Sequence, residues 1–206
     1  MATVGEQELH VLGELKGARG FSSLGNLFCQ FQFEKVNTFK KYFFAASRKV
    51  MGLRLIRLLK VGKHFECVGG KEKGQTQVDY PQAGSKEFVW NHPIDLHYFM
   101  KSMQGWPSLK IEVWTLDNTG GKILCGYGMT YVPRTPGSHE IKCPIWRPSG
   151  TPKEEVLAYF LGPRPQLVDK DVVFKKAASE RCRLFTETSG NILLNVEIIT
   201  RGRRNK

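Results

Sequence analysis

The chain has 206 residues, of which 41% are hydrophobic and 24% are charged; these values are typical of a globular protein and exclude wholesale disorder. This length favours a single domain spanning residues 1–206. The formal net charge of +12 suits an anionic partner. The sequence has no signal-peptide pattern and no run of about 18 apolar residues, so we expect neither secretion nor a membrane-spanning helix.

Two strands are predicted near the start of the chain. Residues 8–15 alternate apolar and polar side chains and then break at glycines. Residues 26–34 alternate more strictly, with Leu27, Cys29, Phe31 and Phe33 on one face. This period of two indicates strands with one buried face.

Residues 35–63 interrupt this rhythm, and we interpret them as a basic insertion that is either helical or disordered. Three interpretations stay open: an insertion that binds anionic lipid or an acidic partner, a solvated loop without a specific role, and an artefact of the gene model. The last two together are favoured, because basic runs are usually solvated. The candidate contacts for an anionic surface are Lys40, Lys41, Arg48, Lys49, Arg54, Arg57 and Lys60.

Strand patterns return in the second half of the chain. The glycine-rich stretch 69–77 is interpreted as a flexible connection rather than a phosphate-binding loop, because it lacks the P-loop spacing. Pro93 lies within a predicted strand, so that strand should lie at a sheet edge or have a bent start. The further predicted strands cover residues 74–79, 87–99, 108–117, 123–133 and 137–146.

The last part of the chain predicts one helix and one hairpin. Thr151, Pro152 and Gly162 suit the start and end of a short helix near 152–161. Residues 181–201 are predicted to form a hairpin that turns at Ser189-Gly190-Asn191, followed by a basic tail at 200–206. In total we expect an all-β fold: an antiparallel β-sandwich of about eight strands.

Several motifs together resemble a known family. The stretches WNHPIDLHY, QGWP, GYG and PGSH are similar to those of the B-nine domain proteins, which are C2-like proteins of the ciliary transition zone. Apart from the basic insertion, the resemblance covers most of the chain from residue 9 to about residue 199. The positions that carry it are Gln75, Trp90, Asn91, Pro93, Asp95, His97, Gly105, Trp106, Pro107, Asp117, Gly126, Gly128, Pro136 and Gly137.

The resemblance implies a C2-like sandwich and a non-enzymatic role without a cofactor. It implies a scaffold component of the tectonic-like, Meckel-syndrome-associated complex, which supports ciliogenesis and the diffusion barrier between ciliary and plasma membranes. The implied partners are that complex and the other two B-nine domain proteins, including the Meckel syndrome type one protein. The implied location is the cytoplasm and cytoskeleton, at the transition zone and basal body. An anionic membrane is an additional candidate partner, and no nucleic acid is expected.

The stretch around His92, Asp95 and His97 has the residue types of a metal site. On a strand, however, residues 95 and 97 share one face and residue 92 lies on the other. Two ligands are too few for zinc, so we expect structural roles and no metal or catalytic residues there.

Calcium and thiol chemistry are also not expected. Of the loop positions that hold calcium in many C2-like domains, Asp117 is acidic and Asn26 is neutral, whereas calcium requires six to eight oxygen ligands. The five cysteines are an odd number and form no CxxC motif, which favours reduced thiols. Cys29 and Cys125 lie in apolar patterns and are predicted to be packing residues.

Overall fold

The structure is a computed structural model that describes residues 7–21, 25–35, 64–81, 85, 87–151, 153, 156, 166–168 and 184–202. Within these residues, nine strands form one antiparallel sheet, so the all-β prediction is confirmed with one strand more than expected. The strands are β1 (Gln7–Arg19), β2 (Phe28–Lys35), β3 (Phe65–Gly70), β4 (Lys73–Gln75), β5 (Glu87–Met100), β6 (Pro107–Leu116), β7 (Lys122–Tyr131), β8 (Gly137–Pro148) and β9 (Thr186–Gly202). Their order in the sheet is β3-β5-β1-β9-β8-β7-β6-β2-β4.

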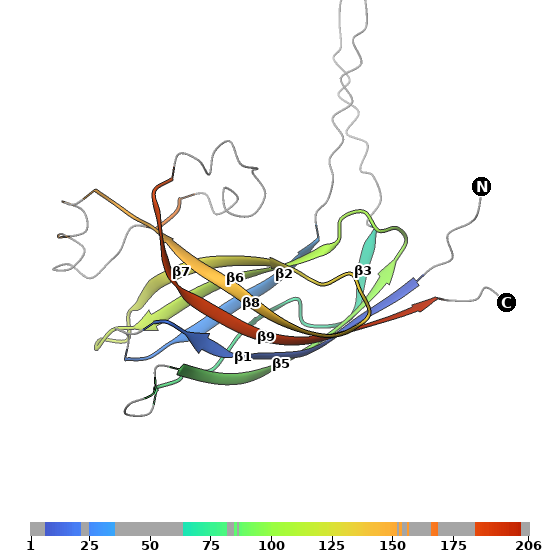
Figure 1. The fold of residues 1–206 in the computed structure, drawn as a ribbon, viewed down its shortest axis with the longest axis horizontal. Coiled ribbons are helices and arrows are strands. Elements are labelled where there is room, and N and C mark those ends of the chain that lie inside the picture. The colour runs from blue at the N-terminus through green and yellow to red at the C-terminus, as the bar shows by residue number, and fades with distance from the viewer. Residues whose placement is uncertain are drawn as a thin grey trace, which may run out of the picture.

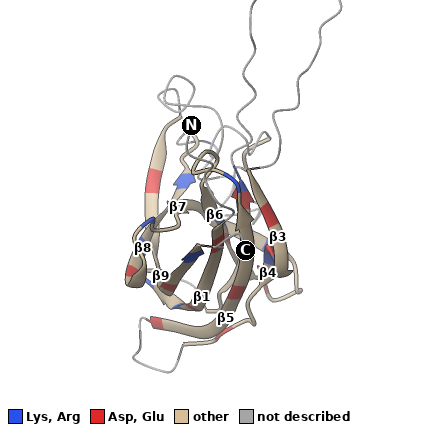
Figure 2. Ribbon diagram, turned by 90° about the vertical axis from the view of Figure 1, so that its right-hand side faces the viewer, with Lys and Arg blue, Asp and Glu red and all other residues tan. Residues whose placement is uncertain are grey.

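The sheet curls into the two facing layers of a C2-like sandwich (Figures 1 and 2). β3 and β4 are its two outermost strands, yet only Lys71 and Glu72 separate them in the chain. Such a short link requires the two ends of the sheet to lie close together. Side chains join these ends: the Lys35 ammonium of β2 lies 5.1 Å from the centre of the Tyr98 ring of β5, and the Phe65 ring of β3 lies 5.6 Å from that of Trp106.

Strand alternation builds the core between the layers, because every second side chain of a strand points to the same face. Leu9 and Val11 of β1 are fully buried, as are Cys29 of β2 and Ile192 of β9. The predicted strand pattern of residues 26–34 is confirmed on this face. On its other face Phe28 is also buried, with the Lys122 ammonium 5.5 Å from its ring centre.

The proline in β5 is accommodated as the sequence predicts. β5 pairs with β1 along its length, but β3 covers only the stretch from Leu96 to Met100. Pro93 therefore lies where β5 is a local edge, and its missing N–H breaks no ladder between β5 and β3. Asn91, two residues before it, has φ of 43°, which bends the start of the strand.

Two predictions are wrong. Residues 181–201 are no hairpin, because β9 continues through Ser189, Gly190 and Asn191, with a register shift against β8 at this point. Gly190 lies against the Phe21 ring and the Arg19 carbonyl, so it serves a close approach and not a turn. The stretch 69–77 is no plain flexible connection either, because it contains the end of β3 and all of β4.

Several predicted features fall outside the described residues. The helix expected near 152–161 lies there except for Lys153 and Val156, and the basic insertion at 35–63 lies there except for Lys35. The expected tail at 200–206 is strand up to Gly202, and its remainder is not described. Among the described residues, no helix has the length and apolar character needed to cross a bilayer.

Candidate functional site

The motif at the start of β5 binds three segments together. Trp90 Nε1 donates to the Leu27 carbonyl at 3.2 Å, and Gln77 Nε2 donates to the Trp90 carbonyl at 2.6 Å. The Val89 N–H donates to the Asp79 carboxylate at 2.8 Å. Leu27 and Asp79 also form a β-bridge. These bonds satisfy the backbone of β5 where β3 does not cover it, so the motif residue Trp90 has a structural role.

The QGWP motif closes one end of the core in the same way. Gly105 has φ of 76°, a conformation that favours glycine. The buried Trp106 donates from Nε1 to the Val132 carbonyl at 2.7 Å, and the Arg134 guanidinium lies 5.9 Å from its ring centre. Pro107 then begins β6 opposite Lys35.

The glycines of the GYG motif allow β8 to cross close to β7. A Cβ atom on Gly126 would lie 2.7 Å from Ile145 Cγ2 and 2.8 Å from the Trp146 carbonyl oxygen. A Cβ atom on Gly128 would also collide with the Ile145 side chain. Because β7 and β8 pair only at Tyr127 and Gly128, this approach depends on the two glycines.

The remaining motif positions lie at turns and exposed strand positions. Gln75 accepts a hydrogen bond from Gln30 across the β2–β4 pair at 2.9 Å. Pro136 and Gly137 are exposed at the start of β8, and Gly137 has φ of 118°. There His139 Nε2 donates to the Thr135 carbonyl at 2.8 Å.

The loop that holds calcium in many C2-like domains is here closed by its own side chains. Asp117 Oδ1 accepts hydrogen bonds from the N–H groups of Thr119 and Gly121 at 2.9 and 2.6 Å, and from the Thr119 hydroxyl at 2.7 Å. These bonds, that of the Thr119 hydroxyl first, lower the pKa of the Asp117 carboxyl. Asn26 bonds the backbone of Leu116 through both its side-chain oxygen and nitrogen. Both residues thus act as local caps.

The structure separates the three residues that the sequence offered as metal ligands. His92 packs against the Phe31 ring, with 5.3 Å between ring centres. Asp95 is exposed and His97 is half-buried on the opposite face of β5. This agrees with the predicted split between the faces.

The structure instead brings His97 together with two residues of β1. The His10 and His97 rings are stacked, 4.1 Å apart and 15° from parallel, and one ligand atom from each of Glu8, His10 and His97 lies within 4.8 Å of the others. Sequence reasoning missed this cluster. The observation that identifies the cluster is the pairing of His10 with His97 between β1 and β5. This pairing can be predicted only when the neighbouring strands are known.

The buried thiols of Cys29 and Cys143 are poor nucleophiles. Burial raises the pKa of Cys143 to about 12 and raises that of Cys29 still further, in part because Cys143 lies nearby. Burial also raises the pKa of the more accessible Cys67. The four described cysteines form no disulfide bond with one another, and the prediction that Cys29 and Cys125 are buried is confirmed. The seven basic residues proposed to contact an anionic surface lie outside the described residues.

Comparison with known proteins points to one family. The model of the family "Ciliary basal body-associated, B9 protein" matches residues 9–199. The chain is 37% identical to B9 domain-containing protein 2 of Rattus norvegicus and 36% identical to that of Homo sapiens, in each case over 194 residues and 94% of both chains. It is 30% identical to B9 domain-containing protein 1 of Homo sapiens over 137 residues, 66% of this chain and 67% of the relative.

Among solved structures, the C2A domain of plant Extended Synaptotagmin 1 aligns over the full length of both chains. The TM-score of 0.36 and the sequence identity of 10% are low. This similarity supports no functional conclusion.

Proposed function

The chain belongs to the B9 domain family of ciliary basal body-associated proteins, and from this premise we propose that it is a non-enzymatic scaffold of the tectonic-like complex at the ciliary transition zone. In this role it supports ciliogenesis and the barrier to diffusion between the ciliary and plasma membranes. The observation that carries the proposal is the family match, which extends over residues 9–199. The proposed location is the cytoplasmic and cytoskeletal side of the transition zone and basal body.

The geometry of the signature residues supports a scaffold over an enzyme. Trp90 and Trp106 use their side-chain N–H groups to bond backbone carbonyls, and Gly126 is needed for close packing. The buried thiols of Cys29 and Cys143 have raised pKa values, which disfavours the reactive thiolate. The motifs thus stabilise the sandwich, which in the proposed role binds other proteins through its surface.

The proposed partners are the other two B9 domain proteins, including the Meckel syndrome type one protein. Within the described sheet, β3 and β4 are the outermost strands and each pairs on one side only. Outer strands can accept a further strand through their backbone groups. Docking through these edges, or face to face between related sandwiches, is the proposed mechanism.

Affinity purification of the tagged full-length chain from ciliated cells, followed by chemical cross-linking, tests this proposal. We expect the related B9 domain proteins to be recovered, with cross-links that involve Lys71 and Lys73 beside the outermost strands. An unrelated sandwich protein carrying the same tag is the control. Recovery of neither B9 relative would contradict the proposed scaffold role.

A further inference from the structure

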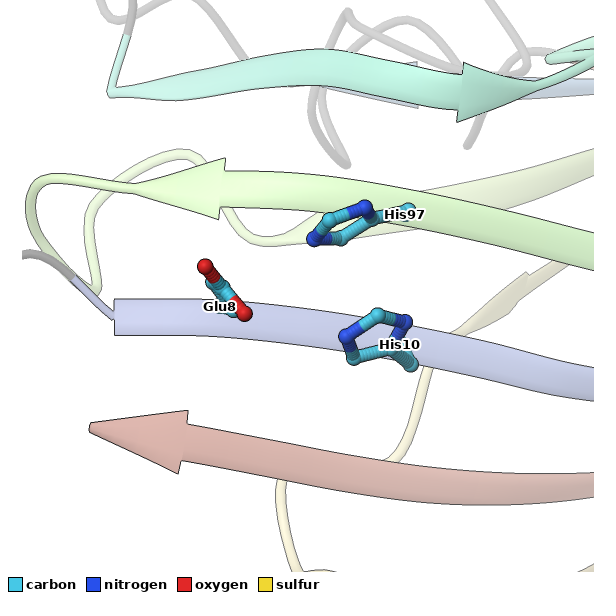
Figure 3. Close-up of side chains that lie close together, drawn as sticks. All are labelled: Glu8, His10 and His97. Carbon is cyan, nitrogen blue, oxygen red and sulfur yellow. The ribbon is translucent and has the colours of Figure 1, made fainter. Parts of the chain in front are cut away.

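The cluster of Glu8, His10 and His97 lies on the outer face of the sheet, away from the core. Figure 3 shows the three side chains next to one another on two adjacent strands, β1 and β5. His10 and His97 are direct cross-strand partners, and Glu8 lies two residues before His10 on the same face. All three are half-buried. Two paired strands of the sheet therefore hold them in place.

The chemistry of this set suits a transition-metal ion. Two imidazoles and one carboxylate are the ligands of a class of zinc sites that keep a fourth position for water. Two nitrogens bound to one Zn²⁺ at about 2.1 Å lie at most about 4.2 Å apart, and the ligand atoms here lie within 4.8 Å of one another. Small side-chain rotations would close that difference.

An unpartnered atom in the cluster supports the same conclusion. His97 Nε2 is buried, and among the described residues it has no hydrogen-bond partner. A buried polar atom without a partner costs about 1–3 kcal/mol, and a metal ion would satisfy it. The Phe99 ring, 5.6 Å from the His97 ring centre, offers it no conventional partner.

The residues that pair with the cluster on the neighbouring strands offer no competing ligand for an ion. Gly69 lies opposite His97 on β3 and has no side chain to cover it. Ile199 lies opposite His10 on β9 and is neutral, whereas Arg201 lies opposite Glu8. No ion pair links Arg201 to Glu8 within the described part of the chain, so the carboxylate is available as a ligand.

We propose that Glu8, His10 and His97 form a binding site for one divalent transition-metal ion of the Zn²⁺ class, with water in the remaining position. The ion cross-links β1 to β5 on the face opposite the core. This inference goes beyond the proposed scaffold function and does not depend on it.

Calorimetric titration of Zn²⁺ into the full-length, chelator-treated protein tests the site. We expect one equivalent to bind, and we expect His10→Gln and His97→Gln each to weaken binding by at least about tenfold, since loss even of residues that only support metal ligands costs 10–100-fold. His139→Gln is the matched control, because His139 lies at the start of β8; it should bind like the unchanged protein.

A wild-type measurement keeps the test independent of how the variants fold. We expect Zn²⁺ to shift the imidazole NMR signals of His10 and His97 and to leave those of His139 unchanged. Bound Co²⁺ should show no thiolate charge-transfer absorption. Absence of binding, unchanged affinity in both folded histidine variants, or a thiolate signal with unshifted His10 and His97 would each overturn the site. None of these results bears on partner binding.

Discussion

Two tryptophans of this protein, Trp106 and Trp114, differ in what their side-chain N–H groups contribute to stability. Trp106 Nε1 donates to the Val132 carbonyl at 2.7 Å. Trp114 Nε1 is buried and has no hydrogen-bond partner among the described residues. The same residue type therefore contributes differently at the two positions.

We expect Trp106→Phe to lower the free energy of unfolding by about 1–3 kcal/mol more than Trp114→Phe. The first substitution leaves the Val132 carbonyl without its donor, and the second removes an N–H that has no partner. Both lose the same volume, so Trp114→Phe is the matched control. Urea unfolding followed by circular dichroism measures the difference, and equal losses would contradict the assigned hydrogen bond.

Asp117 gives the turn after β6 a dependence on pH. Its pKa is lowered by the hydrogen bonds it accepts in the folded turn. The ionised Asp117 carboxylate therefore stabilises the folded turn fully at pH values above the ordinary carboxyl pKa of about 3.9. This stabilisation is lost as the pH falls through the lower pKa of the folded state.

We expect the amide NMR signals of Thr119 and Gly121 to titrate together, with a midpoint below the ordinary carboxyl value, because both N–H groups donate to Asp117 Oδ1. Asp117→Asn, which has no carboxyl to titrate, is the control and should abolish this step. A midpoint at or above the ordinary value would show that the bonds do not form in solution.

At the scale of elements, β7 and β8 are joined by fewer paired residues than any other two neighbouring strands of the described sheet. The two strands pair at only two positions, and their approach depends on Gly126 having no Cβ atom. Elsewhere β8 is held by its long pairing with β9. A larger residue at position 126 should therefore push β8 away from β7.

We expect Gly126→Ala to destabilise the protein by about 1–3 kcal/mol, the usual cost of overpacking. Gly25→Ala is the control: a Cβ there meets nothing within 4 Å, so its effect should stay within about 0.5 kcal/mol. Thermal unfolding of both variants measures the contrast. Equal melting temperatures for the two variants would contradict the close approach.

The basic insertion distinguishes two proposed functions, the scaffold role and the alternative of calcium-independent binding to anionic lipid. Residues 39–60 carry seven basic and no acidic side chains, and each basic residue near an anionic membrane contributes about 1 kcal/mol. If the scaffold role is sufficient, isolated protein should float weakly with phosphatidylserine vesicles at physiological salt. Deletion of residues 39–60 should then change flotation little.

Strong, salt-sensitive flotation that disappears on deletion of residues 39–60 would favour the lipid-binding role instead. Neutral phosphatidylcholine vesicles are the control for non-specific adsorption. Chelation of calcium should have no effect under either role, because the Asp117 loop is closed by its own hydrogen bonds.

At the scale of the whole molecule, the larger of the two hydrophobic clusters of the described residues contains Cys29 and Cys143. The reactivity of these two thiols therefore reports on opening of the core. Cys29 and Cys143 are fully buried. With a pKa of about 12 for Cys143, only about one molecule in ten thousand would carry that thiolate at pH 8. Both thiols should therefore react only when the core opens.

We expect a thiol reagent to label Cys29 and Cys143 at rates that rise with urea in parallel with unfolding, because only opened molecules expose them. Cys67, which is half-buried, should react in native buffer and serves as the internal control. Peptide mass spectrometry resolves the individual sites. Labelling of Cys29 as fast as Cys67 without urea would contradict a closed core.

Local periodicity was sufficient to predict most strands, since it depends on which side chains along one segment are apolar. The motifs around Trp90 and Trp106 were sufficient to predict the family. Local signals failed at Ser189–Asn191, where turn-forming residues lie inside β9 because Gly190 accommodates Phe21. They failed again at residues 69–77, where two short strands close the sheet.

Only the tertiary structure shows which strands are neighbours, and this decides the candidate metal site. His10 and His97 lie far apart in the chain and meet through the β1–β5 register. A strand's own pattern defines which face each side chain occupies but not which strand lies beside it, because pairing depends on the packing of the whole sheet. Of the three residues, the sequence therefore offered only His97 as a candidate ligand, and its convergence with Glu8 and His10 required the tertiary structure.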